Sequence, residues 1–366
     1  MIKIMIAPNR YIQGPRVLEK TGKYIVHLGS RVFFIGGLTA LSIVKDQVSA
    51  SLRENSMEYQ FEAFSGECTR ASAAQFFEKA RTFRTDVVAG VGGGRAIDTA
   101  KAVSHELGSA LVIIPTVASN DAPCSALAVQ YQENHMLDRF LILKRNPDVV
   151  LVDSKVIAEA PTRYFVAGMG DALATWFEAF TCTQSGAKNL PGGVTTAAAL
   201  NLARLCYDTL MEYGVSAKLA VDQNALTPAV EKVIEVNILL SGLGFESSGL
   251  AAAHGIHEGV HALGGTEGAL HGEMVAFGTI AQLVMENYST GEIDRVIDFC
   301  KAVGLPVTLR QLGVSDSSPQ NLMKAAEVAC MEGLTTHNSP FEINPELVLG
   351  AIIGANALGE ASLKRS

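Results

Sequence analysis

The sequence predicts an α/β N-terminal domain built on a mostly parallel, doubly wound sheet, followed by an all-α C-terminal domain. Up to about Pro161, short runs rich in β-branched residues alternate with helix-like segments, a pattern typical of a parallel sheet. After Pro161 these runs disappear, and long Ala/Leu/Glu stretches take their place. A cluster of glycines between a strand-like and a helix-like run is typical of a phosphate-binding loop in such a sheet. We therefore expect one domain over residues 1–161 and a second over residues 162–366.

Three kinds of strand signal occur in the first domain. The segment 1–8 is apolar but too short for a signal peptide, so it predicts an opening strand. Residues 125–131 and 139–143, joined by the polar residues 132–135, predict a hairpin inserted into the sheet. The strands of the sheet itself are predicted at 31–35, 59–64, 86–89, 110–114 and 149–152.

The second domain is predicted to be helical throughout, with Gly, Pro and Ser/Asn clusters separating its helices. The longest helical patterns cover 164–182, 195–211, 229–243, 273–287 and 345–363. In an α/β sheet the ligand lies outside the carboxyl ends of the strands. We therefore expect the glycine loop to face the helical domain, with the active site in the cleft between the two domains.

The composition describes a globular protein and excludes several kinds of partner. The chain has 366 residues, 48% of them hydrophobic and 18% charged, which suits two well-buried domains. A net charge of −8 argues against nucleic acid and anionic membranes as partners, and we expect no segment that approaches a transmembrane span. The six cysteines show no C-x-x-C spacing, so they indicate neither a disulfide framework nor a cysteine zinc site. A cytoplasmic location follows as the expectation.

The glycine loop follows the predicted strand 86–89 and contains Gly92, Gly93 and Gly94 before a helical run that includes Asp98. Glycines let the backbone approach a bulky anion, and a helix N-terminus offers free N–H groups to a phosphate. The loop departs from the G-x-G-x-x-G pattern, because Arg95 stands at the last position. It therefore favours dinucleotide pyrophosphate binding in a Rossmann-like domain, with a tight structural turn as the alternative.

Three residues of the helical half form a candidate metal site: Asp171, His254 and His271. Two imidazoles and one carboxylate can bind Zn²⁺ with a fourth position open, or Fe²⁺ as a facial triad. Asp171 could instead cap a helix, and either histidine could be a hydrogen-bonded core residue. His257 and His261 follow His254 by three and seven residues, on the same face if this segment is helical, so they are alternative ligands or residues that support the ligands.

Several longer motifs resemble one known family. Segments 120–127, 168–179, 244–247 with 252–254, and 271–278 are similar, in the same order, to segments of the bacterial glycerol dehydrogenases. These enzymes form the zinc-using branch of the iron-containing alcohol dehydrogenase superfamily. The resemblance extends from Tyr11 to the last helices, and so covers essentially the whole chain.

This resemblance implies NAD-dependent oxidation of glycerol to dihydroxyacetone and the reverse reaction, with other vicinal diols as further candidates. The expected chemistry is metal-assisted alkoxide formation and hydride transfer to the nicotinamide. The resemblance also implies a homo-oligomer, commonly an octamer. It places Asp171, His254 and His271 on the zinc ligands of the family, and it gives His257 and His261 supporting or structural roles.

The resemblance assigns further residues to cofactor and substrate. Asp121 falls on the residue that contacts glycerol, with an Asx-turn before Pro123 as the alternative, and Phe245 falls on a wall of the same pocket. Gly94 and Arg95 fall on cofactor-phosphate positions. The positions that line the adenosine and nicotinamide parts are Thr116, Ser119, Ser125, Leu127 and Tyr131.

The chain departs from the family pattern at Gly37, where an acidic residue is frequent. A carboxylate there would bind the adenine ribose and repel a 2′-phosphate, so we expect NAD as cofactor with weakened discrimination against NADP. A hydroxycarboxylate or other polyol dehydrogenase of the superfamily is the nearest alternative. Dehydroquinate synthase and glycerol-1-phosphate dehydrogenase are more distant alternatives, because the sequence around the two histidines lacks the Lys and Arg that their charged substrates require. A non-catalytic NAD-binding protein is the remaining one.

Overall fold

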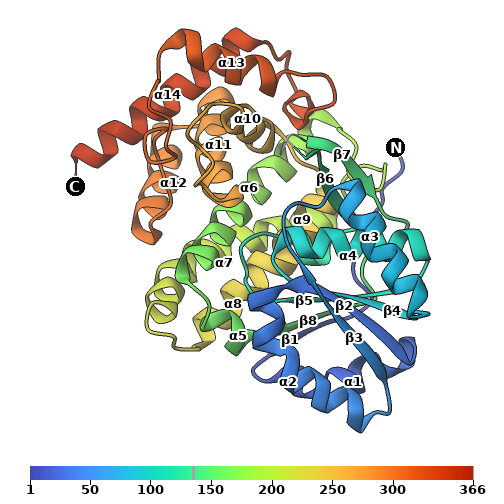
Figure 1. Ribbon diagram of the computed structural model, residues 1–366. Coiled ribbons are helices and arrows are strands. Elements are labelled where there is room, and N and C mark those ends of the chain that lie inside the picture. The colour runs from blue at the N-terminus through green and yellow to red at the C-terminus, as the bar shows by residue number, and fades with distance from the viewer. Residues whose placement is uncertain (134–136, 366) are drawn as a thin grey trace. The chain divides into compact units, whose positions relative to one another are not determined.

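The computed structural model describes residues 1–133 and 137–365, and these form two compact units (Figure 1). The first, called here the α/β unit, consists of Ile6–Phe165 and Ala220–Gly242. The second, called the helical unit, consists of Met1–Met5, Val166–Leu219 and Leu243–Ser366. Each unit therefore contains chain segments that are distant in sequence, and residues 220–242 return to the unit that carries the sheet.

The α/β unit is built on one six-stranded sheet with the order β1-β8-β5-β4-β2-β3, and every neighbouring pair is parallel. This confirms the predicted parallel sheet. Its strands are β1 (Tyr11–Gly14), β2 (Arg31–Gly37), β3 (Glu58–Phe64), β4 (Val87–Gly92), β5 (Ala110–Pro115) and β8 (Val149–Asp153).

Both faces of this sheet are buried, because successive side chains of a strand point to opposite faces. In β2, Val32 and Phe34 belong to one apolar cluster, whereas Phe33 and Ile35 belong to another. Figure 1 shows α1 (Thr21–Ile25) and α2 (Leu38–Glu54) on one face of the sheet. It shows α3 (Arg70–Thr82) and α4 (Gly94–Leu107) on the other. A near-continuous apolar run such as 32–35 is therefore what a doubly covered strand requires.

The direction of the chain through the sheet reverses next to β2. From β2 the chain moves outward to β3, then returns to the other side of β2 to form β4, and continues through β5 to β8. The reversal leaves the carboxyl ends of β2 and β4, at Gly37 and Gly92, side by side without a connection crossing between them. In open α/β sheets this switch point is where ligands bind.

The hairpin prediction is confirmed, whereas the predicted opening strand at 1–8 is wrong. The hairpin is a separate antiparallel sheet of β6 (Leu127–Tyr131) and β7 (Leu137–Ile142), and residues 134 and 135 of its predicted connection lie outside the described residues. At the N-terminus only Lys3 pairs, in an isolated bridge with Val194. The edge position beside β8 is taken by β1, and Pro8 cannot donate to a strand ladder.

Three helices of the α/β unit matter for the site: the short 3₁₀ helix η3 (Ala122–Cys124), α8 (Pro228–Glu235) and the π-helical turn η4 (Val236–Leu240) that follows α8. The shorter elements η1 (Val17–Lys20), η2 (Val26–Leu28) and α5 (Ser154–Ala158) complete the unit.

The helical half confirms the predicted change of pattern, since the described residues after Pro161 contain helices but, beyond β-bridge residue Val194, no strand pairing. Within the helical unit, α10 packs against α11 and α13, and α14 packs against α11, α12 and α13. Besides α8 and η4, the described helices after Pro161 are α6 (Thr162–Ser185), α7 (Ala197–Val221), α9 (Ser241–Ser248), α10 (Ala252–His261), α11 (His271–Met285), α12 (Thr290–Val303), α13 (Pro319–Ala329), η5 (Thr335–Asn338) and α14 (Pro345–Lys364).

Helix α14 corrects the expectation that no segment approaches a transmembrane span. By length and composition alone it could cross a bilayer, since its mean hydropathy reaches 1.3 over the apolar window and a third of that window is buried. The core helix of a soluble domain meets the same criterion. The packing of α14 against α11, α12 and α13 accounts for the buried third of that window.

Candidate active site

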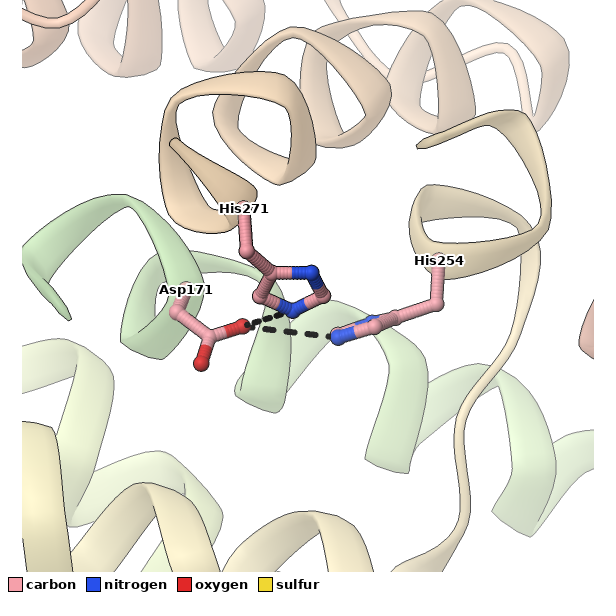
Figure 2. Close-up of side chains that lie close together, drawn as sticks. All are labelled: Asp171, His254 and His271. Carbon is pink, nitrogen blue, oxygen red and sulfur yellow. Dashed lines mark ion pairs between the residues drawn. The ribbon is translucent and has the colours of Figure 1, made fainter. Parts of the chain in front are cut away.

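The three predicted metal ligands converge in the helical unit, each from a different helix (Figure 2). Asp171 lies in α6, His254 in α10 and His271 at the first position of α11. The Asp171 Oδ1 lies 3.4 Å from His254 Nε2 and 3.3 Å from His271 Nε2, and the three donor atoms are all within 4.8 Å of one another. One carboxylate oxygen and two imidazole nitrogens at this spacing fit a single Zn²⁺ or Fe²⁺ ion.

Two glycines bring the first and third of these ligands together. A Cβ built on Gly170 would collide with the carbonyl oxygen of Gly272, and one built on Gly272 would collide with the carbonyl of Ala167. The backbones of α6 and α11 therefore touch, with Asp171 and His271 each adjacent in sequence to one of these glycines. A side chain at either position would separate the two helices and pull the donor atoms apart.

Glu178 fixes the second ligand, and the sequence interpretation did not single it out. Its buried carboxylate accepts hydrogen bonds from the backbone N–H groups of Ala251 (2.9 Å) and His254 (3.0 Å) and lies 2.7 Å from His254 Nδ1. When Nδ1 donates a hydrogen bond, the lone pair of the ring lies on Nε2, which can then bind a metal ion. The available signal was spacing, because Glu178 follows Asp171 by two helical turns and so lies on the same face of α6.

His257 supports the third ligand. Its Nε2 lies 3.3 Å from His271 Nδ1, and its ring packs edge-on against the His271 ring at a centroid distance of 4.5 Å. The ring of His261 lies farther out, 6.3 Å from that of His257. His257 therefore contacts a predicted ligand and His261 contacts His257, and their supporting roles stay a prediction.

The charges of this cluster oppose the effect of burial. Burial raises the pKa of Asp171, but the imidazoles of His271 and His254 outweigh it and hold that pKa below its usual range. Burial lowers the pKa of His254, yet Glu178 and Asp171 raise it well above its ordinary value. Because a metal ion must displace any proton from its ligands, loading of this site depends on pH.

The glycine loop has the geometry of an anion site at the carboxyl end of β4. Gly92 has φ +128°, a conformation that favours glycine, and a Cβ on Gly94 would lie 2.8 Å from Asn120 Nδ2. Helix α4 begins at Gly94, and among the described residues no side chain caps its N-terminus at Gly93. Its first N–H groups can therefore bind phosphate oxygens.

Comparisons with known proteins decide the family. Residues 8–154 match the family model described as iron-containing alcohol dehydrogenase. A glycerol dehydrogenase from Escherichia coli O6:H1 is 44% identical over 364 residues, which cover 100% of this chain and 99% of that protein. The chain belongs to the iron-containing alcohol dehydrogenase family. It is therefore an oxidoreductase, and the family implies NAD and a metal ion as cofactors.

Two further relatives are similar to this chain over almost its whole length, one compared by structure and one by sequence. The crystal structure of a probable glycerol dehydrogenase from Sinorhizobium meliloti 1021 is 42% identical and superposes with a TM-score of 0.93, covering 98% of this chain and 100% of that one. A glycolaldehyde reductase from Halobacterium salinarum is 42% identical over 98% of each chain.

Three of the residues predicted to bind NAD lie around the glycine loop and helix α4 of the α/β unit. Arg95 lies in the first turn of α4, where its guanidinium forms a 2.9 Å ion pair with Glu67. Asp98 is buried in the same helix, and its carboxylate accepts a hydrogen bond from the Val129 N–H of the hairpin. Thr116 follows β5, and its N–H donates to the carbonyl of Gly92 at 3.2 Å.

Lys101 connects α4 to the segment that carries Ser125 and Leu127, and the sequence interpretation did not identify it. Its side chain is fully buried, and Nζ donates to the carbonyls of Ala122 and Leu127, both at 2.6 Å, and to Ser125 Oγ at 3.0 Å. A buried ammonium is retained only where it is well hydrogen-bonded. One buried lysine thus holds two of the predicted cofactor residues against the helix that begins at the glycine loop.

The other predicted residues lie near this segment or in the helical unit. Ser119 precedes η3 and Tyr131 ends β6, where its N–H donates to the carbonyl of Cys68 at 2.9 Å. Asp121 stands at the N-cap of η3, and its Oδ2 accepts a 2.8 Å hydrogen bond from Ser241 Oγ. Phe245 is buried in α9 of the helical unit.

Gly37 ends β2 and is the N-cap of α2. A Cβ built there would have no described atom within 4 Å, and its φ of −61° suits any residue. A larger side chain would therefore fit at this position, where the sequence has glycine.

Proposed function

We propose that this chain oxidises glycerol to dihydroxyacetone with NAD as the hydride acceptor, and that it also catalyses the reverse reaction. The observation that carries the proposal is the convergence of Asp171, His254 and His271 in a chain 44% identical, over its whole length, to a glycerol dehydrogenase. The reaction removes a hydride from carbon and a proton from oxygen, so that a CH–OH group and NAD⁺ give a ketone, NADH and H⁺. Related vicinal diols are further substrates of this proposal.

Asp171, His254 and His271 would hold the metal ion. When bound, the metal acts as a Lewis acid that favours loss of the proton from the substrate hydroxyl. The donor set suits both Zn²⁺ and Fe²⁺, and the resemblance to the zinc-using branch favours Zn²⁺. Elemental analysis of the purified protein tests this choice.

The glycine loop and the residues after β5 would hold NAD. Gly92, Gly93 and Gly94 allow the pyrophosphate to approach, and the first turn of α4 with Arg95 binds it. The NAD-binding set is completed by Asp98, which orders the hairpin, and by Thr116, Ser119, Ser125, Leu127 and Tyr131.

Asp121 and Phe245 would act on the substrate. As a carboxylate, Asp121 accepts a hydrogen bond from a hydroxyl of glycerol, which favours polyols over simple alcohols. Phe245 forms an apolar wall of the substrate pocket. In this proposal residues 1–161 bind NAD and contribute Asp121 to the polyol, and residues 162–366 bind the metal and form the rest of the substrate pocket.

We also propose a homo-oligomer, an octamer by resemblance, located in the cytoplasm. Apolar side chains exposed on α14, among them Ile353 (39%) and Leu363 (42%), support association with further copies of the chain. All six cysteines are free, which supports a reducing compartment. Light scattering coupled to size-exclusion chromatography measures the number of subunits.

The deciding experiment measures NAD reduction with glycerol, propane-1,2-diol and a 2-hydroxy acid, and NADH oxidation with glycolaldehyde. Each assay is run before chelation, after chelation and after addition of Zn²⁺. We expect the highest kcat/KM with the two diols, loss of activity on chelation, and recovery with Zn²⁺. Activity on the hydroxy acid alone, or indifference to chelation, would overturn the proposal.

His271→Ala is the matched variant for the metal site. It removes one of the three donor atoms, at a position outside the α/β unit. We expect loss of metal and of turnover, with NAD affinity preserved in a fluorescence titration. Full turnover in this variant would remove His271 from the site.

A further inference from the structure

The continuous helical segment that begins at Pro228 contains a π-helical turn, η4, between α8 and α9. A π-turn inserts an extra residue into a helix and shifts which side chains face a neighbouring segment; such turns often occur at functional sites. Asn237, in this turn, and Ser241, the first residue of α9, both contact the segment that carries Asp121. Both side chains are fully buried.

Asn237 anchors the beginning of this segment. Its Nδ2 donates to the carbonyl of Ala118 at 3.1 Å and to the carbonyl of Phe165 at 3.0 Å. Its Oδ1 is also buried, and within the described part of the chain it accepts no hydrogen bond. Burying a polar atom without a partner is costly. We therefore take the two hydrogen bonds donated by Nδ2 as the contacts that hold this side chain in place.

Ser241 acts on Asp121 itself. Its hydroxyl donates to Asp121 Oδ2 at 2.8 Å, and the next residue, Gly242, lies so close to η3 that a Cβ there would be 3.2 Å from the carbonyl oxygen of Asp121. The backbone of the helix and the Asp121 segment are thus packed directly together. A short hydrogen bond to a carboxylate fixes the rotation of that carboxylate about its Cβ–Cγ bond.

We infer that Ser241 is a positioning residue for substrate binding, which acts by holding the carboxylate of Asp121 in the orientation that accepts a substrate hydroxyl. This inference rests on the proposed function, in which Asp121 contacts glycerol. Asn237 and Ser241 are four residues apart, so they lie on the same face of this continuous helix and meet the same segment.

The test compares Ser241→Ala and Ser241→Cys with the wild-type enzyme, in steady-state kinetics with glycerol and NAD. The alanine variant removes the donor, and the cysteine variant keeps a weak one of similar size. We expect Ser241→Ala to raise the KM for glycerol about 10-fold, with the KM and Kd for NAD unchanged, and Ser241→Cys to fall in between. Ser362→Ala in α14 is the control, since it removes a buried hydroxyl whose hydrogen bond goes to the main-chain carbonyl of Gly359 and not to a carboxylate.

A double-mutant cycle with Asp121→Ala separates positioning from a general structural role. If Ser241 acts through Asp121, Ser241→Ala has no further effect on the KM for glycerol in the Asp121→Ala background. Additive effects, or a Ser241→Ala effect no larger than that of Ser362→Ala, would overturn the inference. A wild-type enzyme that does not oxidise glycerol counts against the proposed function instead, so the two failures are distinguishable.

Discussion

At the scale of single residues, the carboxylate of Glu178 decides which nitrogen of His254 faces the metal position. One of its oxygens accepts from two backbone N–H groups, and the other lies 2.7 Å from His254 Nδ1. An imidazole that donates from Nδ1 has its lone pair on Nε2, which is the form that binds a metal. The ligand geometry therefore depends on a residue that never touches the metal position.

Glu178→Gln should reverse this tautomer. The amide oxygen can still accept from the backbone, but the amide NH₂ then faces Nδ1 and favours a proton on Nε2. We expect the affinity for Zn²⁺ to fall about 10- to 100-fold, as measured by competition with a chromogenic chelator. Glu212→Gln, on the exposed side of α7, is the control, and an unchanged metal affinity in Glu178→Gln would contradict this account.

Gly37 is the residue where cofactor choice can be tested. It lies at the switch point of the sheet, with open space in place of a side chain. Gly37→Asp should bind the adenine ribose of NAD and repel the 2′-phosphate of NADP, and we expect the ratio of kcat/KM for NAD over NADP to rise about 10-fold or more. Gly37→Asn is the matched control, because it caps α2 equally well without the charge. Equal ratios in the two variants would rule out an electrostatic cause.

At the scale of secondary-structure elements, α4 both begins the phosphate loop and holds the segment after β5. Lys101, in the second turn of α4, makes three hydrogen bonds to that segment. A single buried donor thus joins η3 and β6 to the helix. Without it, the carbonyls of Ala122 and Leu127 and the hydroxyl of Ser125 would each lose the hydrogen bond from the ammonium.

Lys101→Met should therefore destabilise the protein by about 3 kcal/mol or more, as measured by urea unfolding. We also expect a weaker NAD affinity, because Ser125 and Leu127 lose their anchor. Lys155→Met, which removes an exposed ion pair with Glu159, should change stability by less than about 1 kcal/mol. Similar unfolding midpoints for the two variants would show that Lys101 does not hold the segment.

At the scale of the whole molecule, one buried carboxyl makes stability depend on pH. Burial raises the pKa of Glu286 from about 4.5 to about 7, although hydrogen bonds from Thr181 and Gln282 act in the opposite direction. The folded state therefore binds this proton more tightly than the unfolded state does. The resulting stabilisation is fully present below pH 4.5 and is lost as the pH rises through 7.

Glu286→Gln keeps a neutral side chain at every pH. We expect the difference in unfolding free energy between this variant and the wild-type protein to shift in favour of the variant between pH 5 and pH 8, by about 2–3 kcal/mol. Unfolding at a series of pH values, with metal and buffer ionic strength held constant, measures this shift. A difference that is constant over this pH range would show that Glu286 titrates normally.

Local sequence patterns by themselves determined the fold class, the parallel strands after residue 30, the hairpin, the long helices and the glycine loop. These features depend on the periodicity of apolar residues and on the conformational freedom of glycine, which are properties of neighbouring residues. The same patterns indicated Asp171, His254 and His271 as candidate metal ligands. The spacing of these residues could not establish that they meet.

Only the tertiary structure decided which distant residues meet. Asp171 and His271 are adjacent because the backbones of α6 and α11 touch at Gly170 and Gly272. Glu178, Lys101 and Ser241 likewise contact residues of elements that are far apart in sequence: Glu178 contacts His254, Lys101 contacts Ala122, and Ser241 contacts Asp121. The edge of the sheet was likewise settled by packing, because β1 pairs with β8 there, whereas the strand predicted at 1–8 does not form. The physical reason is that periodicity records which face of an element is buried, whereas the partner that covers that face is chosen by the packing of the whole chain.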